Sequence, residues 1–86
     1  MNIELSTRFK RSFRKLHPRI QDKAVAKMKI FKESGDRERR LRVHKLHGEK
    51  HSEWAYSVDQ SYRISFIFLD PQTILYTDIG THDTVY

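Results

Sequence analysis

Apolar and polar positions alternate most clearly in the last third of the chain. Over Tyr62 to Leu69, one face of an extended backbone carries Tyr62, Ile64, Phe66 and Phe68. Strict alternation of this kind predicts a strand with one face in a core. Asp70-Pro71-Gln72 has turn chemistry, because Pro71 fixes φ and donates no ladder hydrogen bond. The β-branched and aromatic run from Thr73 to Ile79 predicts a second strand, antiparallel to the first, which ends at the backbone breaker Gly80.

Two stretches before residue 35 have the spacing of amphipathic helices. The first has one apolar stripe and follows Ser6 or Thr7, either of which can cap a helix; the stripe is Phe9, Phe13 and Leu16. His17-Pro18 ends this helix, because the residue before a proline is pushed out of the α region. The second helix runs to about Ser34, with Gly35 as its stop and a stripe made of Ile20, Ala24, Met28 and Phe31.

Three further stretches have strand character: Asn2 to Leu5, Leu41 to Gly48, and Glu53 to Asp59. The resulting order is β-α-α-β-β-β-β. Two helices joined at a proline make a hairpin with one apolar side, which must cover something, and the sheet is the candidate. We therefore predict one α+β domain over residues 1–86, in which a two-helix hairpin packs on one face of a small antiparallel sheet.

Basic residues are concentrated in one segment. The chain has 17 Lys and Arg against 11 Asp and Glu, a net charge of +6. Residues 8–45 hold 15 of the basic residues and four of the acids, so this segment carries +11 and the remainder −5. A field this uneven suits a polyanionic partner such as nucleic acid, although a solvated, soluble surface is the simpler reading of a charge run.

Several classes of protein are disfavoured. A small secreted domain would normally need disulfides and this chain has no cysteine, so a cytoplasmic protein is expected. The first ten residues have no apolar region typical of a signal peptide. The longest apolar run, Ile64 to Leu69, is interrupted by Ser65 and is too short to span a bilayer, so no membrane partner is expected.

The histidines at His44, His47 and His51 form a cluster that permits three interpretations. They would ligate a metal, lie on the surface of a loop, or include one residue, His44, that moves protons near neutral pH. No Cys or acidic ligand accompanies them closely, and His44 and His47 would point to opposite faces of a strand. We therefore predict no metal and no cofactor.

Three residues after the middle of the chain suit chemistry on a phosphodiester. Arg63 lies on the face opposite the apolar stripe, where it is either simply exposed or a phosphate clamp with a planar donor fork. His82 is a candidate proton donor or acceptor and Tyr86 a stacking group, unless the terminus is only frayed. Metal-free RNA cleavage needs a base, an acid and positive charge, and His44, His82 and Arg63 are residues of those types.

The whole chain resembles the RelE/ParE superfamily of bacterial toxin–antitoxin toxins. The resemblance is carried most specifically by Tyr62-Arg63-Ile64 before an apolar strand and by the ending Gly80-x-His82…Tyr86. The His-x-Leu-x-Gly at residues 44–48 is similar to the YafQ branch. There are departures. Between Tyr56 and Ser61 the chain lacks the further His of that branch, where Asp59 would be a partial substitute, and it lacks the additional C-terminal helix of RelE-like toxins.

The resemblance implies a type II toxin: a ribosome-dependent endoribonuclease that cuts translated mRNA and is blocked by a cognate antitoxin protein. Matching motifs place functional roles on His44, Arg63, His82 and Tyr86. The basic segment would then bind ribosomal RNA and mRNA, through Lys23, Lys27, Lys29, Lys32, Arg40 and Arg42. Two alternatives remain. One is a ParE-like toxin that binds DNA gyrase without nuclease activity, and the other is a decayed toxin that binds only its antitoxin.

Overall fold

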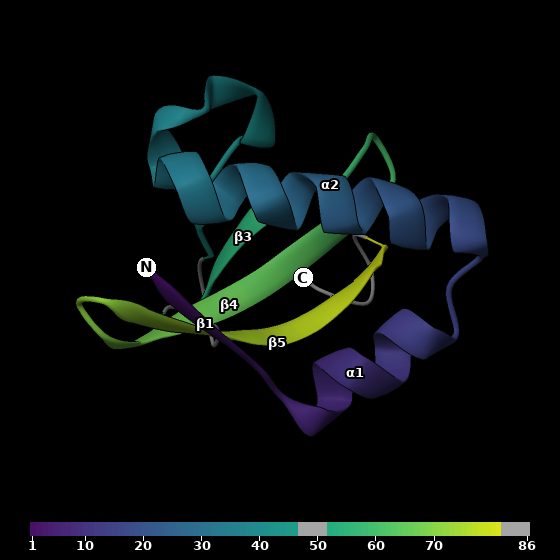
Figure 1. Ribbon diagram of the computed structural model, residues 1–86, viewed down its shortest axis with the longest axis horizontal. Coiled ribbons are helices and arrows are strands. Elements are labelled where there is room, and N and C mark those ends of the chain that lie inside the picture. The colour runs from purple at the N-terminus through teal and green to yellow at the C-terminus, as the bar shows by residue number, and fades with distance from the viewer. Residues whose placement is uncertain (47–51, 82–86) are drawn as a thin grey trace.

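One sheet organises the molecule, and both helices lie on the same side of it (Figure 1). The computed structural model describes residues 1–46 and 52–81. In chain order, these residues form β1 (Asn2–Leu5), α1 (Thr7–Arg14), α2 (Pro18–Ser34), the 3₁₀ turns η1 (Gly35–Arg37) and η2 (Arg39–Leu41), β2 (His44–Lys45), β3 (Trp54–Ser57), β4 (Tyr62–Asp70) and β5 (Thr73–Thr81). The predicted α+β class and the predicted order of helices and strands are confirmed.

The sheet is mixed rather than antiparallel, which corrects the prediction. Its strand order is β1-β5-β4-β3-β2, and β1 pairs with β5 in parallel register, Asn2 opposite Thr73 and Leu5 opposite Tyr76. The other described pairings are antiparallel. Local pattern cannot give the direction of β1, because its partner lies some seventy residues away along the chain and is chosen only when the sheet assembles.

Two predicted strand boundaries were also wrong. Gly80 does not break β5 but pairs with Arg63 inside the ladder, and the strand continues to Thr81. The strand predicted from Leu41 is reduced to His44–Lys45, because the chain first makes the turn η2 and then a left-handed residue, Arg42, with φ 56°. Non-glycine residues rarely adopt this conformation, and it redirects the chain before it reaches the sheet.

Each helix begins at a side-chain cap. The Oγ of Ser6 accepts the backbone N–H of Phe9 at 3.0 Å and donates to the carbonyl of Thr77 at 3.1 Å, so the cap of α1 also anchors this helix to β5. At α2, the Nδ1 of His17 accepts the N–H of Arg19 at 3.1 Å, and Pro18 occupies the first helical position. Both helix starts follow from the residues that the sequence places there.

Aromatic rings fill the layer between the helices and the sheet. Phe31 of α2 stacks on Tyr56 of β3 with ring centroids 4.7 Å apart, and Phe9 of α1 lies 5.2 Å from Tyr76 of β5. Both helices therefore cover the same face, as predicted. The apolar stripe of β4 is buried at Ile64 and Phe66, but Phe68 is half exposed because it lies beyond the helices, at the rim of a small apolar groove with Trp54.

The opposite face of the sheet carries small and polar side chains. Ser65 is buried, and its hydroxyl lies 2.7 Å from that of Thr77, which in turn donates to Glu53 at 3.0 Å. A bulge after Ser65 interrupts the register between β4 and β5 in this region. Among residues 1–46 and 52–81, no helix has both the length and the apolar character needed to cross a bilayer.

Candidate functional site

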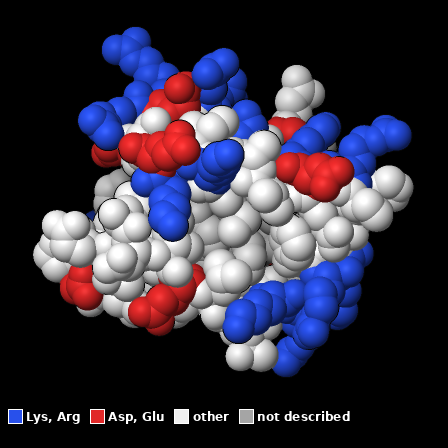
Figure 2. Space-filling view, in the orientation of Figure 1, with Lys and Arg blue, Asp and Glu red and all other residues white. Residues whose placement is uncertain are grey.

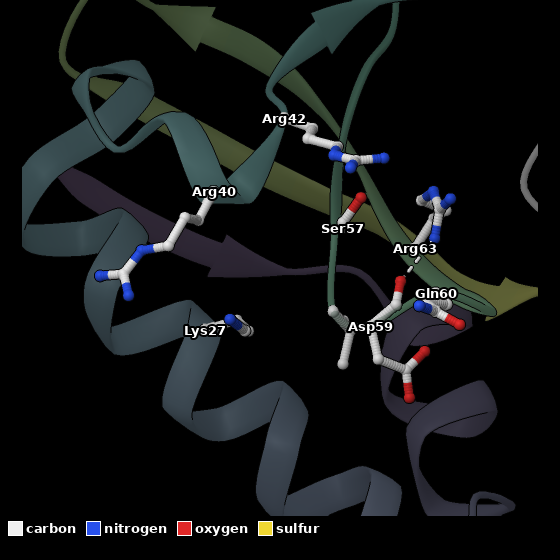
Figure 3. Close-up of a pocket in the computed structure, with 8 residues that line it drawn as sticks. Lys27, Arg40, Arg42, Ser57, Asp59, Gln60 and Arg63 are labelled. Atoms are coloured by element: carbon white, nitrogen blue, oxygen red, sulfur yellow. Dashed lines mark hydrogen bonds between the residues drawn. The ribbon is translucent and has the colours of Figure 1, made fainter.

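A basic cavity lies at the β3 side of the sheet, between α2, the turn η2 and the turn that joins β3 to β4 (Figure 3). Its volume is about 450 Å³. The described residues that line it are Lys27, Arg40, Arg42, Ser57, Val58, Asp59, Gln60 and Arg63. We refer to this feature as the basic cavity. Its size is that of a small-ligand pocket, and its charge suits an anion.

The cavity is open because β2 begins late, at His44. β2 pairs only with Trp54 and Ala55, so within the described part of the chain no strand lies beside Ser57 on that edge of β3. The left-handed turn at Arg42 produces this arrangement, since it brings the chain into the sheet only at His44. Figure 3 shows the Arg42 and Arg63 side chains near each other, with the Ser57 hydroxyl directed toward them.

Arg63 is the most firmly held cation of the cavity. It is half-buried on β4, opposite Ser57 of β3 and the side-chain-free Gly80 of β5. Its Nη1 donates to the carbonyl of Asp59 at 2.7 Å and to that of Tyr62 at 3.1 Å. Within residues 1–46 and 52–81, its Nε and Nη2 make no hydrogen bond or ion pair, so this side of the guanidinium retains donors for a ligand.

The other cations of the cavity differ in how far they are already paired. Arg40 is exposed, and its Nε donates to Glu38 at 3.0 Å. This hydrogen bond lowers the pKa of Glu38 below its ordinary value, so the Glu38 carboxylate stays ionised at neutral pH. Its negative charge offsets part of the positive charge of Arg40. Lys27 and Arg42 make no ion pair with the described acids. Lys27, Arg42 and Arg63 therefore supply most of the net positive charge of the cavity.

Asp59 contributes its backbone to the cavity while its carboxylate is occupied elsewhere. Oδ1 accepts the N–H groups of Ser61 and Tyr62, both at 2.8 Å, and Oδ2 lies 3.6 Å from Lys23 Nζ. Partial burial tends to raise the pKa of Asp59, but the two N–H donors and Lys23 outweigh it and lower the pKa below its ordinary value. The carboxylate therefore stays ionised at neutral pH and is not set up to exchange a proton.

The structure places two of the four predicted catalytic residues. Arg63 lines the basic cavity. His44 is exposed on β2, opposite Ala55, and does not line it. His44 Nδ1 lies 2.8 Å from the carbonyl of Arg42, so Nδ1 is the donor in this contact. His82 and Tyr86 lie outside the described residues, but β5 ends at Thr81, paired with Tyr62.

The six predicted RNA-binding residues do not form one surface. Lys27, Arg40 and Arg42 line the basic cavity, and Lys23 lies beside it through its pair with Asp59. Lys29 and Lys32 are exposed on α2 and do not line the cavity. Ser57 and Gln60 also line the cavity, and no sequence pattern marks them, because only the fold brings the end of β3 beside Arg42.

A separate basic surface covers α1. Figure 2 shows Lys and Arg gathered over this helix, which carries no acidic residue; its basic residues are Arg8, Lys10, Arg11 and Arg14. Arg8 is paired with the buried Asp78 of β5 at 3.1 Å, and the others are exposed. We refer to this surface as the α1 basic face. It lies on the β5 side of the sheet, whereas the basic cavity lies on the β3 side.

The described residues contain no group of three His, Cys, Asp or Glu side chains arranged to hold a metal. His47 and His51, two members of the histidine cluster in the sequence, lie outside the part of the chain that the structure describes. The basic cavity itself is lined by cations and one occupied carboxylate, a donor set that suits an anion rather than a metal ion.

The chain has the fold of the RelE/ParE superfamily of toxins. YafQ from E. coli matches 99% of this chain and 97% of its own, with a TM-score of 0.81 at 15% sequence identity. A YoeB/ParE toxin from Agrobacterium tumefaciens matches with a TM-score of 0.70 at 11% identity, covering 95% of this chain and 99% of its own. The RelBE2 toxin–antitoxin complex of Mycobacterium tuberculosis matches with a TM-score of 0.65 at 24% identity, covering 94% and 96%.

The resemblance inferred from the sequence is therefore confirmed for the fold. No known family profile matches the chain, and no curated protein sequence matches it. At these identities the likeness is one of backbone architecture over essentially the whole chain. The chemistry must be argued from the residues of the basic cavity.

Proposed function

We propose that this protein is the toxin of a type II toxin–antitoxin pair, and that it cleaves translated mRNA on the ribosome by metal-independent acid–base chemistry. The observation that carries the proposal is the basic cavity. Lys27, Arg42 and the unoccupied side of Arg63 face one space at the edge of the sheet. An RNA phosphate in that space would meet charge-assisted donors, which are strongest where negative charge develops in the transition state.

The proposed reaction begins when a base removes the proton of a ribose 2′-hydroxyl, which then attacks the adjacent phosphorus. An acid protonates the departing 5′-oxygen, and Arg63 holds the phosphorane. His44 and His82 are the candidates for proton transfer, because histidine changes charge near neutral pH. In His44, the hydrogen bond from Nδ1 to the carbonyl of Arg42 fixes the orientation of the ring. Tyr86 is proposed to stack on an unpaired base of the codon.

The ribosome supplies what a chain of this size lacks. A domain of 86 residues has a small surface for ordering a flexible mRNA. Positioning of the reactants accounts for a large part of the barrier to such reactions, and a ribosome that already holds the codon provides it. We accordingly place the activity in the cytoplasm. The basic residues outside the cavity would bind ribosomal RNA.

A cognate antitoxin protein is the proposed inhibitor. Two structural neighbours were solved as toxin–antitoxin complexes, the E. coli DinJ–YafQ complex and RelBE2. An antitoxin that covers the basic cavity would exclude mRNA and would need acidic groups opposite its cations. Co-expression of a neighbouring antitoxin gene should restore growth to cells in which this chain arrests it.

The test has a cellular part and a purified part. Induce the chain in a bacterium and map new mRNA 5′ ends; then incubate the purified protein with naked mRNA and with programmed ribosomes. We expect cuts within translated frames and only on ribosomes. Equal cutting of naked mRNA would reject ribosome dependence. Growth arrest through DNA gyrase without new 5′ ends would indicate a ParE-like toxin, and neither effect would indicate a decayed toxin.

A further inference from the structure

Asp59 connects three parts of the molecule at the edge of the basic cavity. Its Oδ1 accepts the backbone N–H of Ser61 and of Tyr62, each at 2.8 Å. Its Oδ2 lies 3.6 Å from Nζ of Lys23 on α2. Its backbone carbonyl accepts Nη1 of Arg63 at 2.7 Å. One residue thus links a helix, the β3–β4 turn and the guanidinium on the cavity wall.

The two carbonyls that hold Arg63 depend on the Asp59 carboxylate to different degrees. The first is the carbonyl of Asp59 itself, whose direction is set by the turn that Oδ1 closes. The second belongs to Tyr62 and accepts Arg63 Nη1 at 3.1 Å, but this carbonyl is also held by the strand ladder, where it accepts the N–H of Val58 at 2.9 Å. If this carboxylate were removed, the Asp59 carbonyl, which is the nearer of the two acceptors, would gain freedom.

The orientation of Arg63 matters because only one side of its guanidinium is engaged. Nη1 is turned toward the two carbonyls, and in the described part of the chain Nε and Nη2 have no hydrogen-bond partner. A phosphate accepts two parallel N–H donors from this kind of edge. An arginine fixed before the ligand arrives loses less freedom on binding than one that must be ordered.

We infer that Asp59 is a positioning residue of the proposed nuclease site, which holds Arg63 so that its free N–H donors meet the scissile phosphate. The inference rests on the function proposed above and adds a residue that acts through another. Asp59 transfers no proton in this role. The lowered pKa of its carboxylate agrees with this, because the side chain remains an acceptor across the neutral range.

The simpler role for Asp59 is stabilisation of a turn, and the chain offers a matched control. Asp70 makes the same kind of contact at the β4–β5 turn, where its Oδ1 accepts the N–H of Gln72 at 2.8 Å. Asp70 is exposed and does not line the basic cavity. Asp59→Ala and Asp70→Ala each remove an aspartate turn contact, but only the first removes the support of Arg63.

The experiment compares wild type, Asp59→Ala, Asp59→Asn and Asp70→Ala. Single-turnover cleavage on programmed ribosomes should fall about 10²-fold in Asp59→Ala, the typical effect of a misplaced reacting group, with unchanged affinity for the ribosome. Asp59→Asn should restore most of this loss, since its side-chain oxygen accepts the same two N–H groups. Asp70→Ala should cleave within a few-fold of wild type. The guanidinium NMR signal of Arg63 can be assigned because it is missing from the spectrum of Arg63→Lys. Among the compared variants, only Asp59→Ala should show increased motion of this guanidinium.

Each outcome decides the inference. Equal losses in Asp59→Ala and Asp70→Ala, or an Arg63 signal as ordered in Asp59→Ala as in wild type, would overturn it while the nuclease proposal stands. An Asp59→Asn variant as inactive as Asp59→Ala would also reject it, because the carboxylate charge would then be the feature required. A wild-type protein that cleaves no RNA on ribosomes overturns the proposed function, and the positioning role with it.

Discussion

At the scale of single residues, the candidate site depends on which donors are already used. Nη1 of Arg63 donates to two backbone carbonyls, and among the described residues its Nε and Nη2 make no hydrogen bond. In Arg40, by contrast, Nε already donates to the Glu38 carboxylate. Two arginines of the same cavity thus differ in what they can offer a ligand. A planar fork with two free donors matches a phosphate, which a point charge cannot do.

Arg63→Ala should abolish cleavage with little loss of stability. Its side chain is half-buried and lies on the face of the sheet opposite the aromatic core. Arg63→Lys should recover activity only partly, because a lysine cannot form the paired donor geometry. Cleavage assays on ribosomes and urea unfolding measure the two effects, with the exposed Arg11→Ala of α1 as control. Full activity in Arg63→Ala would reject the phosphate role.

His82→Ala should be nearly silent in a growth-arrest assay while the protein still folds and binds its antitoxin. General acid–base help typically contributes about 10²–10⁴-fold to a rate. If Tyr86 acts by stacking, Tyr86→Phe should keep most activity and Tyr86→Ala should lose it. Single-turnover cleavage within a few-fold of wild type in His82→Ala would leave His44 or a ribosomal group as the acid.

At the scale of elements, the short β2 strand and the helix α2 shape the cavity together. The left-handed residue at Arg42 delays the entry of β2 into the sheet, which leaves the end of β3 uncovered within the described residues. α2 then supplies Lys27 from the side. Because Lys29 and Lys32 lie elsewhere on the same helix, the lysines of α2 fall into two spatial sets, one at the cavity and one away from it.

The two sets of α2 lysines should separate in kinetics. Lys27→Ala should lower the rate of cleavage in ribosome-bound protein, because it removes charge from beside the phosphate. The double variant Lys29→Ala/Lys32→Ala should weaken ribosome binding and leave the bound rate unchanged. Titration of ribosomes under single-turnover conditions yields both quantities. Identical changes in the two variants would show that α2 acts as a single docking surface.

A buried tyrosine pair joins β3 to β5 across the core. The hydroxyls of Tyr56 and Tyr76 lie 2.8 Å apart. Tyr56→Phe should lower the free energy of unfolding by about 1–3 kcal/mol, because the Tyr76 hydroxyl is left without a partner, and the double variant with Tyr76→Phe should recover most of this loss. Urea unfolding of the single and double variants measures the coupling. A double variant no better than either single would contradict it.

The same pair predicts how stability depends on pH. Burial raises the pKa of Tyr76 to about 12, and burial together with Tyr76 raises that of Tyr56 further. The folded state then keeps protons that the unfolded chain loses above its ordinary tyrosine pKa of about 10. The contribution of this pair to stability should therefore be constant below about pH 10 and should fall as pH rises above it, so the alkaline loss of stability should be less steep in the double phenylalanine variant.

At the scale of the whole molecule, the positive charge forms two separate surfaces near opposite sides of the sheet. The basic cavity lies on the β3 side and the α1 basic face on the β5 side. A molecule of net charge +6 with two basic surfaces can hold one polyanion at its site and contact another. On the ribosome these would be mRNA and ribosomal RNA.

Ribosome affinity should therefore fall steeply with salt, and the α1 basic face should account for part of the slope. Each phosphate contact contributes about 0.7–0.9 to the slope of log affinity against log salt. The variant Lys10→Ala/Arg11→Ala should flatten the slope by up to about 1.8 while leaving the cleavage rate of bound protein intact. An unchanged slope would mean that this face only keeps the protein soluble or is reserved for the antitoxin.

Local sequence patterns predict most of the helices and strands. The stripes of Phe9 and Phe31, the cap at Ser6, and the alternation through Ile64 and Phe66 follow from spacing and side-chain chemistry, and the structure confirms them. The same patterns failed at Gly80 and at Leu41. The ladder with Arg63 outweighs the weak strand preference of a glycine, and a left-handed Arg42 has no local sequence signal.

By itself, the sequence determined the class of fold, the order of its elements and the types of residue available for phosphate chemistry. The tertiary structure decided which of these residues lie together in one site. The parallel pairing of β1, the late start of β2 and the placement of Lys27 and Arg63 around one cavity join segments that are far apart along the chain. Side-chain pattern encodes which face is buried, but register, strand direction and the edge at which charges converge depend on contacts that exist only when the sheet and both helices have assembled.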